Sequence, residues 1–166
     1  MAESFDPTTL PGAKASRYAA VAEEVAAVLN GEANVVARQA TVVSMLAGAF
    51  AHYFWTGFYL VDPARPNELV VGPYQGTLGC LRIALGRGVC GTAAAERRTL
   101  IVPDVEAFPG HIACDSRSRS EIVAPVFDAD GALIGVFDVD STELAAFDET
   151  DAAGLERILR ETFGGG

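Results

Sequence analysis

The sequence predicts an α+β domain in which helices pack on a central antiparallel sheet. Two segments with helical periodicity open the chain and a third closes it, and β-prone segments joined by turns lie between them. Strands grouped between helices are typical of α+β folds, whereas strands alternating with helices would predict a wound parallel sheet. The chain has 166 residues, half of them hydrophobic, which suffices for one domain. We expect an N-terminal arm over residues 1–13 and a single domain over residues 14–166.

Capping and terminating residues mark the ends of three long helices. Gly31 follows the first helix, where the left-handed backbone that glycine adopts readily ends a helical segment. Asn34 precedes the second helix and Asp148 precedes the last one, and both side chains are preferred N-caps. With their caps, the expected helices are 14–29, 34–51 and 148–163.

Six short strands are expected between the second and the last of these helices. Turn-forming residues at 62–67 separate the first two strands, and Asp128-Ala-Asp-Gly predicts a hairpin between the last two. A glycine-rich turn at 86–91 opens a short helix after the third strand. The segment 103–120 is a long loop, and such loops commonly line a functional site. The expected strands are 53–61, 68–72, 78–85, 99–102, 122–127 and 133–139.

Composition and charge exclude several classes of function. The net charge is −10 and the arginines are scattered, so we expect no nucleic-acid partner, because nucleic-acid binding needs a basic surface. The N-terminus has acids and no apolar segment, unlike a secretory signal. Gln39–Val61 lacks charged residues and is long enough to span a bilayer, but its periodicity changes midway from helical to β. A buried helix followed by a buried strand fits this change better, so we expect no membrane partner and a cytoplasmic protein.

The three cysteines are an odd number, and a reducing compartment disfavours structural disulfides, so a catalytic or metal-binding role gains weight. Cys90 follows the glycine-rich turn at the expected start of a helix, where N–H groups and the helix dipole stabilise a thiolate. Cys114 lies in the long loop close to His111, and Cys80 lies in an expected strand. A lone cysteine is more often a small buried hydrophobic residue, and this alternative stays open for each of the three.

Other chemistries have weaker sequence signals. One alternative is a metal site made of four residues with suitable ligand atoms, Cys80, Cys90, Cys114 and His111. Their spacing contains no CxxC pair, so we predict no metal. No protease signature surrounds a cysteine. The string Gly86-x-Gly-x-x-Gly matches a dinucleotide fingerprint by letter but lacks the parallel unit and the acidic residue that the fingerprint needs, so we predict no cofactor.

Acidic and aromatic side chains recur on single faces of the expected strands. Asp138 and Asp140 are two residues apart and so share a face, where two carboxylates repel and readily hold one proton between them. The hairpin can bring Glu121 close to this pair. Trp55 and Tyr59 share a face of the first strand, with a glycine between them that leaves a gap of side-chain size. Spacing alone leaves open a solvent-facing edge or calcium ligands for the acids, and plain core packing for the rings.

Seven segments along residues 34–163 have the order and the residues of one known family. They are Trp55-Thr-Gly-Phe-Tyr, Val71-Gly-Pro-Tyr-Gln-Gly, Cys80-Leu-Arg-Ile, Gly86-Arg-Gly-Val-Cys-Gly-Thr-Ala, Gly110-His-Ile-Ala-Cys-Asp, Ser120-Glu-Ile-Val and Asp138-Val-Asp-Ser. Through them the chain resembles the free methionine-(R)-sulfoxide reductases, which are GAF-type domains. The resemblance implies a GAF-like catalytic domain over residues 14–166, and the first thirteen residues look less like the family.

The resemblance also implies roles for individual residues. Cys114 corresponds to the nucleophile, whose thiolate attacks the sulfoxide sulfur, releases methionine and becomes a sulfenic acid. Cys80 then closes a disulfide with it, and Cys90 is a second resolving cysteine or a substrate contact. The expected substrate-binding residues are Trp55 and Tyr59 around the S-methyl end, and Glu121, Asp138 and Asp140 around the ammonium and the sulfoxide oxygen.

Partners follow from the same resemblance. The substrate is free methionine-(R)-sulfoxide, a thioredoxin-type reductant restores the thiols, and the family suggests a homodimer. A non-catalytic sensor of small molecules with the same fold is the alternative function, although no output domain for it is evident in these 166 residues.

Overall fold

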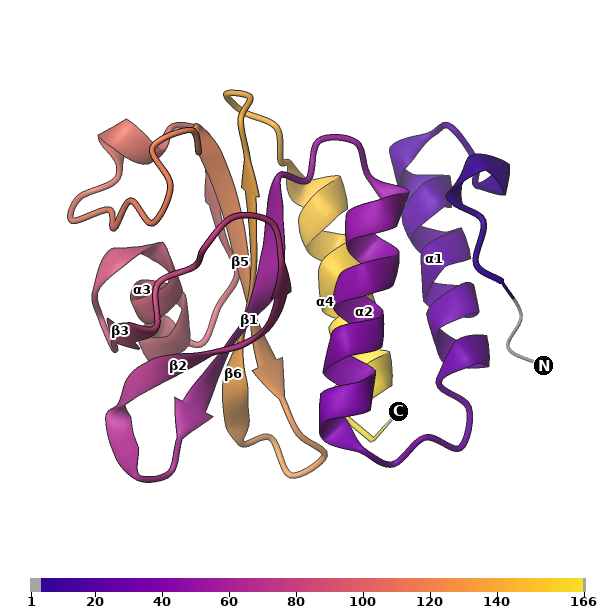
Figure 1. Cartoon of the computed structure of the whole chain (residues 1–166), viewed down its shortest axis with the longest axis horizontal. Coiled ribbons are helices and arrows are strands. Elements are labelled where there is room, and N and C mark those ends of the chain that lie inside the picture. Colours follow the sequence, from indigo (N-terminus) through magenta and orange to yellow (C-terminus); the bar gives the residue numbers. More distant parts are fainter. Residues whose placement is uncertain (1–3, 166) are drawn as a thin grey trace.

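The structure of the chain, a computed structural model, describes residues 4–165. Residues 1–3 and 166, which belong to the expected arm and domain, lie outside the described range. Figure 1 shows a twisted sheet with helices on both of its faces. Three long helices cover one face, and a short helix with several loops covers the other. The helices are α1 (Lys14–Val28), α2 (Val35–Ala49), α3 (Gly88–Glu96) and α4 (Glu149–Phe163), with 3-10 helices at Pro7–Thr9 and Val105–Ala107.

The strands form one antiparallel sheet in the order β3-β2-β1-β6-β5-β4. This arrangement confirms the predicted α+β fold with a central antiparallel sheet. β1 and β6 are the two central strands, so each of them has a neighbour on both sides. The strands are β1 (Trp55–Asp62), β2 (Arg65–Gln75), β3 (Arg82–Ala84), β4 (Leu100–Val102), β5 (Ser120–Phe127) and β6 (Leu133–Ser141).

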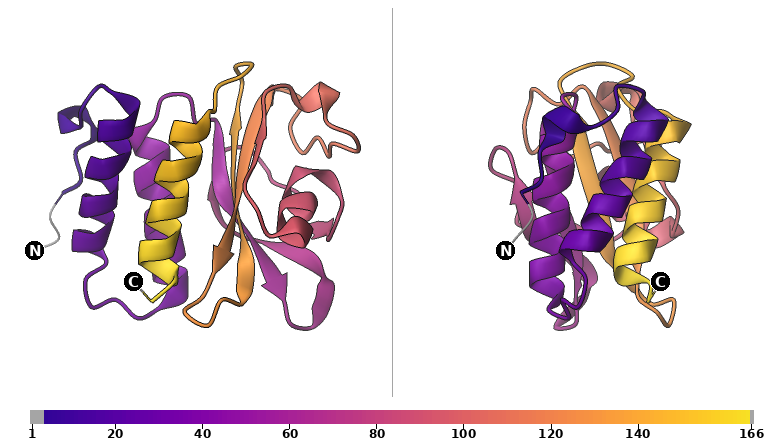
Figure 2. Two further views of the ribbon diagram at one scale, coloured as in Figure 1. Left: turned by 180° about the vertical axis from the view of Figure 1, so that it is seen from behind. Right: turned by 90° about the vertical axis from the view of Figure 1, so that its right-hand side faces the viewer.

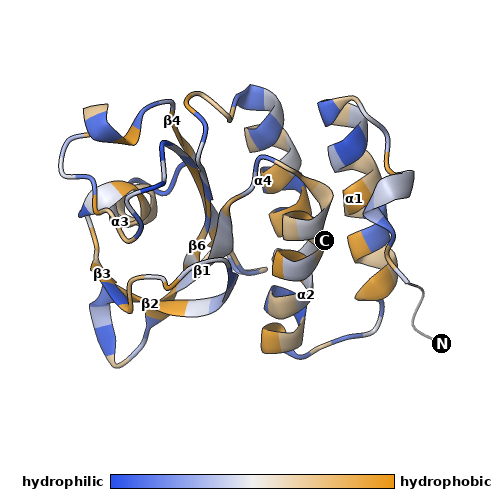
Figure 3. Ribbon diagram, turned by 45° about the horizontal axis from the view of Figure 1, so that its top comes forward, coloured by the Kyte–Doolittle hydropathy of each residue, from blue (hydrophilic) through white to orange (hydrophobic). Residues whose placement is uncertain are grey.

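The helical side of the molecule has two layers. α1 packs on α2 and α4, which lie between it and the sheet (Figure 2). Hydrophobic and hydrophilic residues alternate along α1 in Figure 3, as expected for a helix with one packed and one exposed face. α2 lies between α1 and the sheet. This burial explains why Gln39–Val61 contains no charged residue. Within residues 4–165, no helix is long and apolar enough to cross a membrane.

The predicted helix ends are confirmed. Asn34 Oδ1 accepts a hydrogen bond from the backbone N–H of Ala37 at 3.0 Å, which caps α2. Asp148 caps α4, and the side chain of Asp151 accepts in return from the backbone N–H of Asp148 at 2.8 Å, which completes a capping box. Gly31 follows α1 with a positive φ of 79°.

Two strands, β2 and β3, differ most in length from the prediction. β2 starts early because the Asp62 side chain accepts a hydrogen bond from the backbone N–H of Ala64 and closes the turn within two residues. β3 covers only Arg82–Ala84, so the prediction that Cys80 lies in a strand is wrong. A Cβ at Gly79 would lie 2.9 Å from the Trp55 ring, so the segment before β3 passes close to this ring.

Alternate residues of the central strands point to two separate cores. On β6, Phe137 and Val139 belong to the core on the side of the three long helices. Val136 belongs to the second core, on the face that carries α3, and Asp138 and Asp140 point to that same face. The α3 face therefore carries carboxylates where the helical face carries phenylalanine and valine.

Candidate active site

A small cavity lies on the α3 face of the sheet. Its walls come from β1, β5, β6, the start of α3 and the loop between β4 and β5. All five predicted substrate-binding residues and two of the three cysteines line it, and Cys80 is bonded to one of these cysteines. The lining residues from the predicted set are Trp55, Tyr59, Cys90, Cys114, Glu121, Asp138 and Asp140.

Three carboxyl groups form the floor of this cavity. Asp138 lies opposite Gly57 of β1 and Val123 of β5, and Asp140 lies opposite Glu121. The hairpin therefore brings Glu121 to the pair, as expected from the sequence. Both β5 and β6 have a neighbouring strand on each side, and Glu121 and Asp138 are each only 5% exposed. This burial excludes the alternative of a solvent-facing edge.

The three acids have raised pKa values. Burial raises the pKa of Asp138 well above its usual range, and the charge of Glu121 raises it further. Burial and Asp140 act in the same direction on the pKa of Glu121. Burial and Asp138 raise the pKa of Asp140, although a hydrogen bond with Ser118 opposes this shift. In the described part of the chain no lysine or arginine forms an ion pair with any of the three, so the floor holds protons unless a cation enters.

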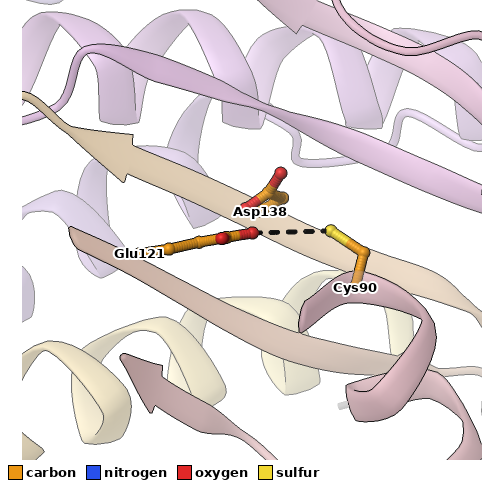
Figure 4. A group of neighbouring side chains, drawn as sticks. All are labelled: Cys90, Glu121 and Asp138. Atoms are coloured by element: carbon orange, nitrogen blue, oxygen red, sulfur yellow. Dashed lines mark hydrogen bonds between the residues drawn. The ribbon is translucent and has the colours of Figure 1, made fainter. Parts of the chain in front are cut away.

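Cys90 faces the same acids. It is the third residue of α3 and is buried, with its Sγ 3.8 Å from Glu121 Oε1 (Figure 4). Burial and then the charges of Asp138 and Glu121 raise the pKa of its thiol well above the usual range. The prediction that the helix start favours a thiolate at Cys90 is therefore wrong, because burial and two carboxyl groups outweigh the helix dipole.

Aromatic rings form one wall of the cavity. The rings of Trp55 and Tyr59 stack with centroids 5.6 Å apart, and Tyr74 stacks on the other side of Trp55 at 5.1 Å. A Cβ at Gly57 would collide with Tyr74 and lie 2.8 Å from the Trp55 ring, so the wall requires glycine there. The Trp55 indole N–H donates to the Thr77 carbonyl at 2.9 Å. The rings of Trp55 and Tyr59 both pack in the core and form a wall of the cavity, because they belong to the second core and also line the cavity.

Cys80 and Cys114 form a disulfide at the edge of the cavity, with Cα atoms 5.5 Å apart. This is the pair that the resemblance implies. Cys114 is exposed and Cys80 is half-buried. The Thr77 hydroxyl donates to Asp115 Oδ2 at 2.7 Å and so joins the two cysteine loops. Arg117 donates to Asp115 as well, and this hydrogen bond holds the pKa of the Asp115 carboxyl well below its usual range.

Sequence reasoning did not single out Thr77, Asp115 or Ser118. The signal for Asp115 was its position directly after Cys114, within a segment that the family shares. Thr77 and Ser118 carried no such signal, because their contacts depend on how distant segments pack.

The four residues considered as metal ligands from the sequence do not form one site, because the sulfurs of Cys80 and Cys114 are bonded to each other. His111 Nε2 lies 3.6 Å from Glu121 Oε2 instead, and burial lowers the pKa of its imidazole. A different group converges, because ligand atoms of Cys90, Glu121 and Asp138 lie within 4.8 Å of one another. These residues come from α3, β5 and β6, so their spacing in the sequence carries no signal for the cluster.

The cavity has a volume of about 30 Å³. That is enough for a water molecule and far less than small-molecule sites usually offer. The arrangement combines a polar floor that can bind a cation or hold protons, an aromatic wall, and a disulfide within reach of an external thiol.

Comparisons with known proteins agree with this geometry. A family model of the GAF domain matches residues 16–161. The chain belongs to the GAF domain family. It is 39% identical over 148 residues to the free methionine-R-sulfoxide reductase of Escherichia coli (strain K12), with 89% of this chain and 87% of that relative covered. It is 51% identical over 149 residues to GAF domain-containing protein A of Dictyostelium discoideum, with 90% of this chain and 92% of that relative covered.

This GAF domain is also similar to a solved structure. The X-ray structure of free methionine-R-sulfoxide reductase from Neisseria meningitidis, in complex with its substrate, is 47% identical in sequence and has a TM-score of 0.89. The match covers 98% of this chain and 93% of that chain. The family resemblance inferred from the sequence motifs is therefore confirmed, and so is the GAF-like fold.

Proposed function

We propose that this GAF domain reduces free methionine-(R)-sulfoxide to methionine. The Cys114 thiolate attacks the sulfoxide sulfur, the oxygen passes to the Cys114 sulfur, and methionine leaves. One electron pair is transferred: the substrate sulfur is reduced and Cys114 is oxidised to a sulfenic acid. A protonated carboxyl of the floor donates a proton to the sulfoxide oxygen, which makes the sulfoxide sulfur more electrophilic and becomes the proton of the sulfenic acid.

Recycling uses the second cysteine of the pair. The Cys80 sulfur attacks the Cys114 sulfenic acid, the hydroxyl leaves as water, and the disulfide forms. A thioredoxin-type dithiol then restores both thiols by exchange and becomes a disulfide itself. A reducing compartment such as the cytoplasm would supply that donor. Cys90 is buried among acids that disfavour its thiolate, which favours a role as a substrate contact over a role as a second resolving cysteine.

One observation carries the proposal: the disulfide borders a pocket whose floor has three carboxyl groups, and no lysine or arginine of residues 4–165 forms an ion pair with them. A free amino acid supplies the missing cation as its α-ammonium. A methionine sulfoxide residue inside a protein has an amide at that position, which cannot satisfy buried carboxylates. In this proposal, Trp55 and Tyr59 pack against the S-methyl end. The printed names of the relatives from E. coli and N. meningitidis support the same activity.

The disulfide form of the pocket must open before this substrate enters. Its volume of about 30 Å³ is far below the roughly 300–1,000 Å³ of ordinary small-molecule sites. Reduction removes the covalent link between the two cysteine loops, and the hydrogen bond from Thr77 to Asp115 is then one of the contacts that hold them together. We therefore expect the reduced protein to bind free methionine sulfoxide and the disulfide protein to bind it much more weakly.

A turnover assay separates this function from the alternative of a non-catalytic sensor. The protein is incubated with free (R)- or (S)-methionine sulfoxide, thioredoxin and thioredoxin reductase, and methionine is measured. We expect turnover of the R form only, loss of activity in Cys114→Ser, and a single turnover in Cys80→Ser. A sensor would bind the sulfoxide without converting it, and full activity of Cys114→Ser would show that the nucleophile is assigned wrongly.

A further inference from the structure

The cluster of Cys90, Glu121 and Asp138 has the geometry of a metal-binding site. Cys90 Sγ lies 3.8 Å from Glu121 Oε1, and one ligand atom from each residue lies within 4.8 Å of the other two. Two ligands of a tetrahedral zinc ion lie about 2.0–2.3 Å from the metal and therefore about 3.5 Å from each other. Figure 4 shows Glu121 extending from β5 toward Cys90 on α3, with Asp138 of β6 beside both. Small side-chain movements would bring all three to ligand distance.

An unsatisfied oxygen points to the same site. Asp138 Oδ1 is buried and has no hydrogen-bond partner, and the residue is only 5% exposed. A buried carboxyl oxygen without a partner is unfavourable, and a bound cation would satisfy it. Among the described residues, His111 is the one basic side chain within ion-pair distance of Glu121, and none is within that distance of Asp138.

The size of the cavity favours an ion over an amino acid. With the Cys80–Cys114 disulfide formed, the volume of about 30 Å³ accommodates one ion or one water molecule. The residues that line it include all three members of the cluster and His111.

We infer that the disulfide form of this pocket binds one divalent cation of the zinc type through Cys90 Sγ and the carboxylates of Glu121 and Asp138. A thiolate ligand favours zinc over magnesium or calcium, which prefer oxygen ligands. On binding, the thiol proton and the protons held by the carboxyl groups pass to solvent, and no group changes its oxidation state. His111 Nε2 lies beside the other oxygen of Glu121 and offers a nitrogen as the fourth ligand.

The bound ion has a consequence for the enzyme. It occupies the carboxylates that bind the substrate ammonium, so it must leave before the sulfoxide enters. This consequence rests on the proposed function, whereas the metal site itself does not. The ion is therefore an exchangeable competitor of the substrate and not a resident structural metal.

Cobalt(II) tests the site directly, because a thiolate bound to cobalt gives a charge-transfer band in the near ultraviolet. The experiment uses the disulfide protein, in which Cys90 is the one cysteine of the three that keeps a thiol. We expect a band that saturates at one cobalt per chain and disappears when one equivalent of zinc is added.

Variants locate the ligands. Cys90→Ser should abolish the band. Asp138→Asn keeps the thiol and should weaken cobalt binding at least about tenfold. Glu106→Gln removes an exposed carboxylate outside the cavity and should bind cobalt as the wild type does. Circular dichroism checks that each variant is folded, and Asp138→Asn carries the test if Cys90→Ser does not fold.

Three results would each overturn the inference: no charge-transfer band in the wild type, a band that persists in Cys90→Ser, or equal cobalt affinity in Asp138→Asn and Glu106→Gln. Sulfoxide turnover is not part of the readout. A protein that binds cobalt as described but does not reduce the sulfoxide would contradict only the proposed function.

Discussion

The two faces of the sheet each bury a carboxylate, and the two have opposite surroundings. On the helical face, Asp151 accepts hydrogen bonds from Lys14 at 2.7 Å and from the Tyr18 hydroxyl at 2.7 Å, and His52 Nε2 lies 3.2 Å away. On the α3 face, Asp138 is buried as well, but its Oδ1 has no partner among the described residues. Cationic and hydrogen-bond-donating side chains of the protein contact Asp151, whereas Asp138 Oδ1 has no such contact within residues 4–165.

The pKa values differ in the same way. Burial alone would raise the pKa of Asp151, but hydrogen bonds with His52 and Lys14 outweigh it and hold the pKa well below its usual range. Burial raises the pKa of Asp138, and the charge of Glu121 adds to that effect. The comparison indicates that a buried acid with protein partners stabilises the fold, whereas one without them is available to a ligand.

Removing the satisfied acid should have the largest effect on stability. Asp151→Ala should lower the free energy of unfolding by about 3 kcal/mol, because it breaks the contacts with Lys14 and Tyr18 and the capping box of α4. Urea unfolding measures the change. The control Glu149→Ala removes an exposed acid from the same helical turn and should cost about 0.5 kcal/mol. Equal losses in the two variants would contradict the stabilising role of Asp151.

Removing the unsatisfied acid, Asp138, should lower activity without lowering stability. Asp138→Asn should lower kcat/KM for free methionine sulfoxide about ten- to a hundredfold, because a charge-assisted hydrogen bond is worth about 1.5–3 kcal/mol. Its free energy of unfolding should be unchanged or higher, since asparagine replaces a carboxyl group whose charged form burial disfavours. A marked loss of stability in Asp138→Asn would break the comparison between the two faces.

The sequence predicted much of the fold because its signals are local. The caps at Asn34 and Asp148 and the hairpin at residues 128–131 depend on neighbouring residues, and all three were located correctly. The change of period within Gln39–Val61 also marked the change from helix to strand. The proposed homodimer stays a prediction.

The rest of the site depends on contacts between distant segments. Cys90 has an unfavourable environment for a thiolate because β5 and β6 place Glu121 and Asp138 against α3. Cys80 lies outside β3, next to Gly79, whose close approach to the Trp55 ring is a contact that no local pattern marked. The partners Lys14 and Tyr18 of Asp151 lie 137 and 133 residues away in the chain, so no local pattern marked that acid.

A smaller effect is expected where α4 makes room for Tyr18. A Cβ at Gly154 would lie 2.7 Å from Tyr18 Cβ and would displace the ring that donates to Asp151. Gly154→Ala gains about 1 kcal/mol of helix propensity, but overpacking costs about 1–3 kcal/mol, so we expect a net loss of about 1 kcal/mol. Thermal or urea unfolding measures it. A gain in stability, as at an ordinary helical glycine, would contradict the packing argument.

The pH dependence of stability should separate the two faces. Asp151 has a lowered pKa, so its contribution is present above the unfolded pKa and is lost as the pH falls through the folded pKa. Asp138 has a raised pKa, so its contribution is present below the unfolded pKa and is lost as the pH rises through the folded pKa. Urea unfolding from about pH 3 to about pH 9 should therefore show a shallower acid decline in Asp151→Ala and a shallower alkaline decline in Asp138→Asn. The reverse assignment would contradict both pKa directions.

The central claim is that the acids of the α3 face, which form no ion pair with a lysine or arginine of residues 4–165, recognise the ammonium of a free amino acid. The most direct measurement compares kcat/KM for free and N-acetylated (R)-methionine sulfoxide on the wild type, Asp138→Asn and Asp140→Asn. The wild type should prefer the free substrate about ten- to a hundredfold, since acetylation removes the cation. In the variant that has lost the ammonium partner, acetylation of the substrate should lower kcat/KM little further. That variant should have chiefly a higher KM, whereas the variant that has lost the proton donor should have chiefly a lower kcat. Equal wild-type kcat/KM for the two substrates would contradict the claim, even if the protein reduced both.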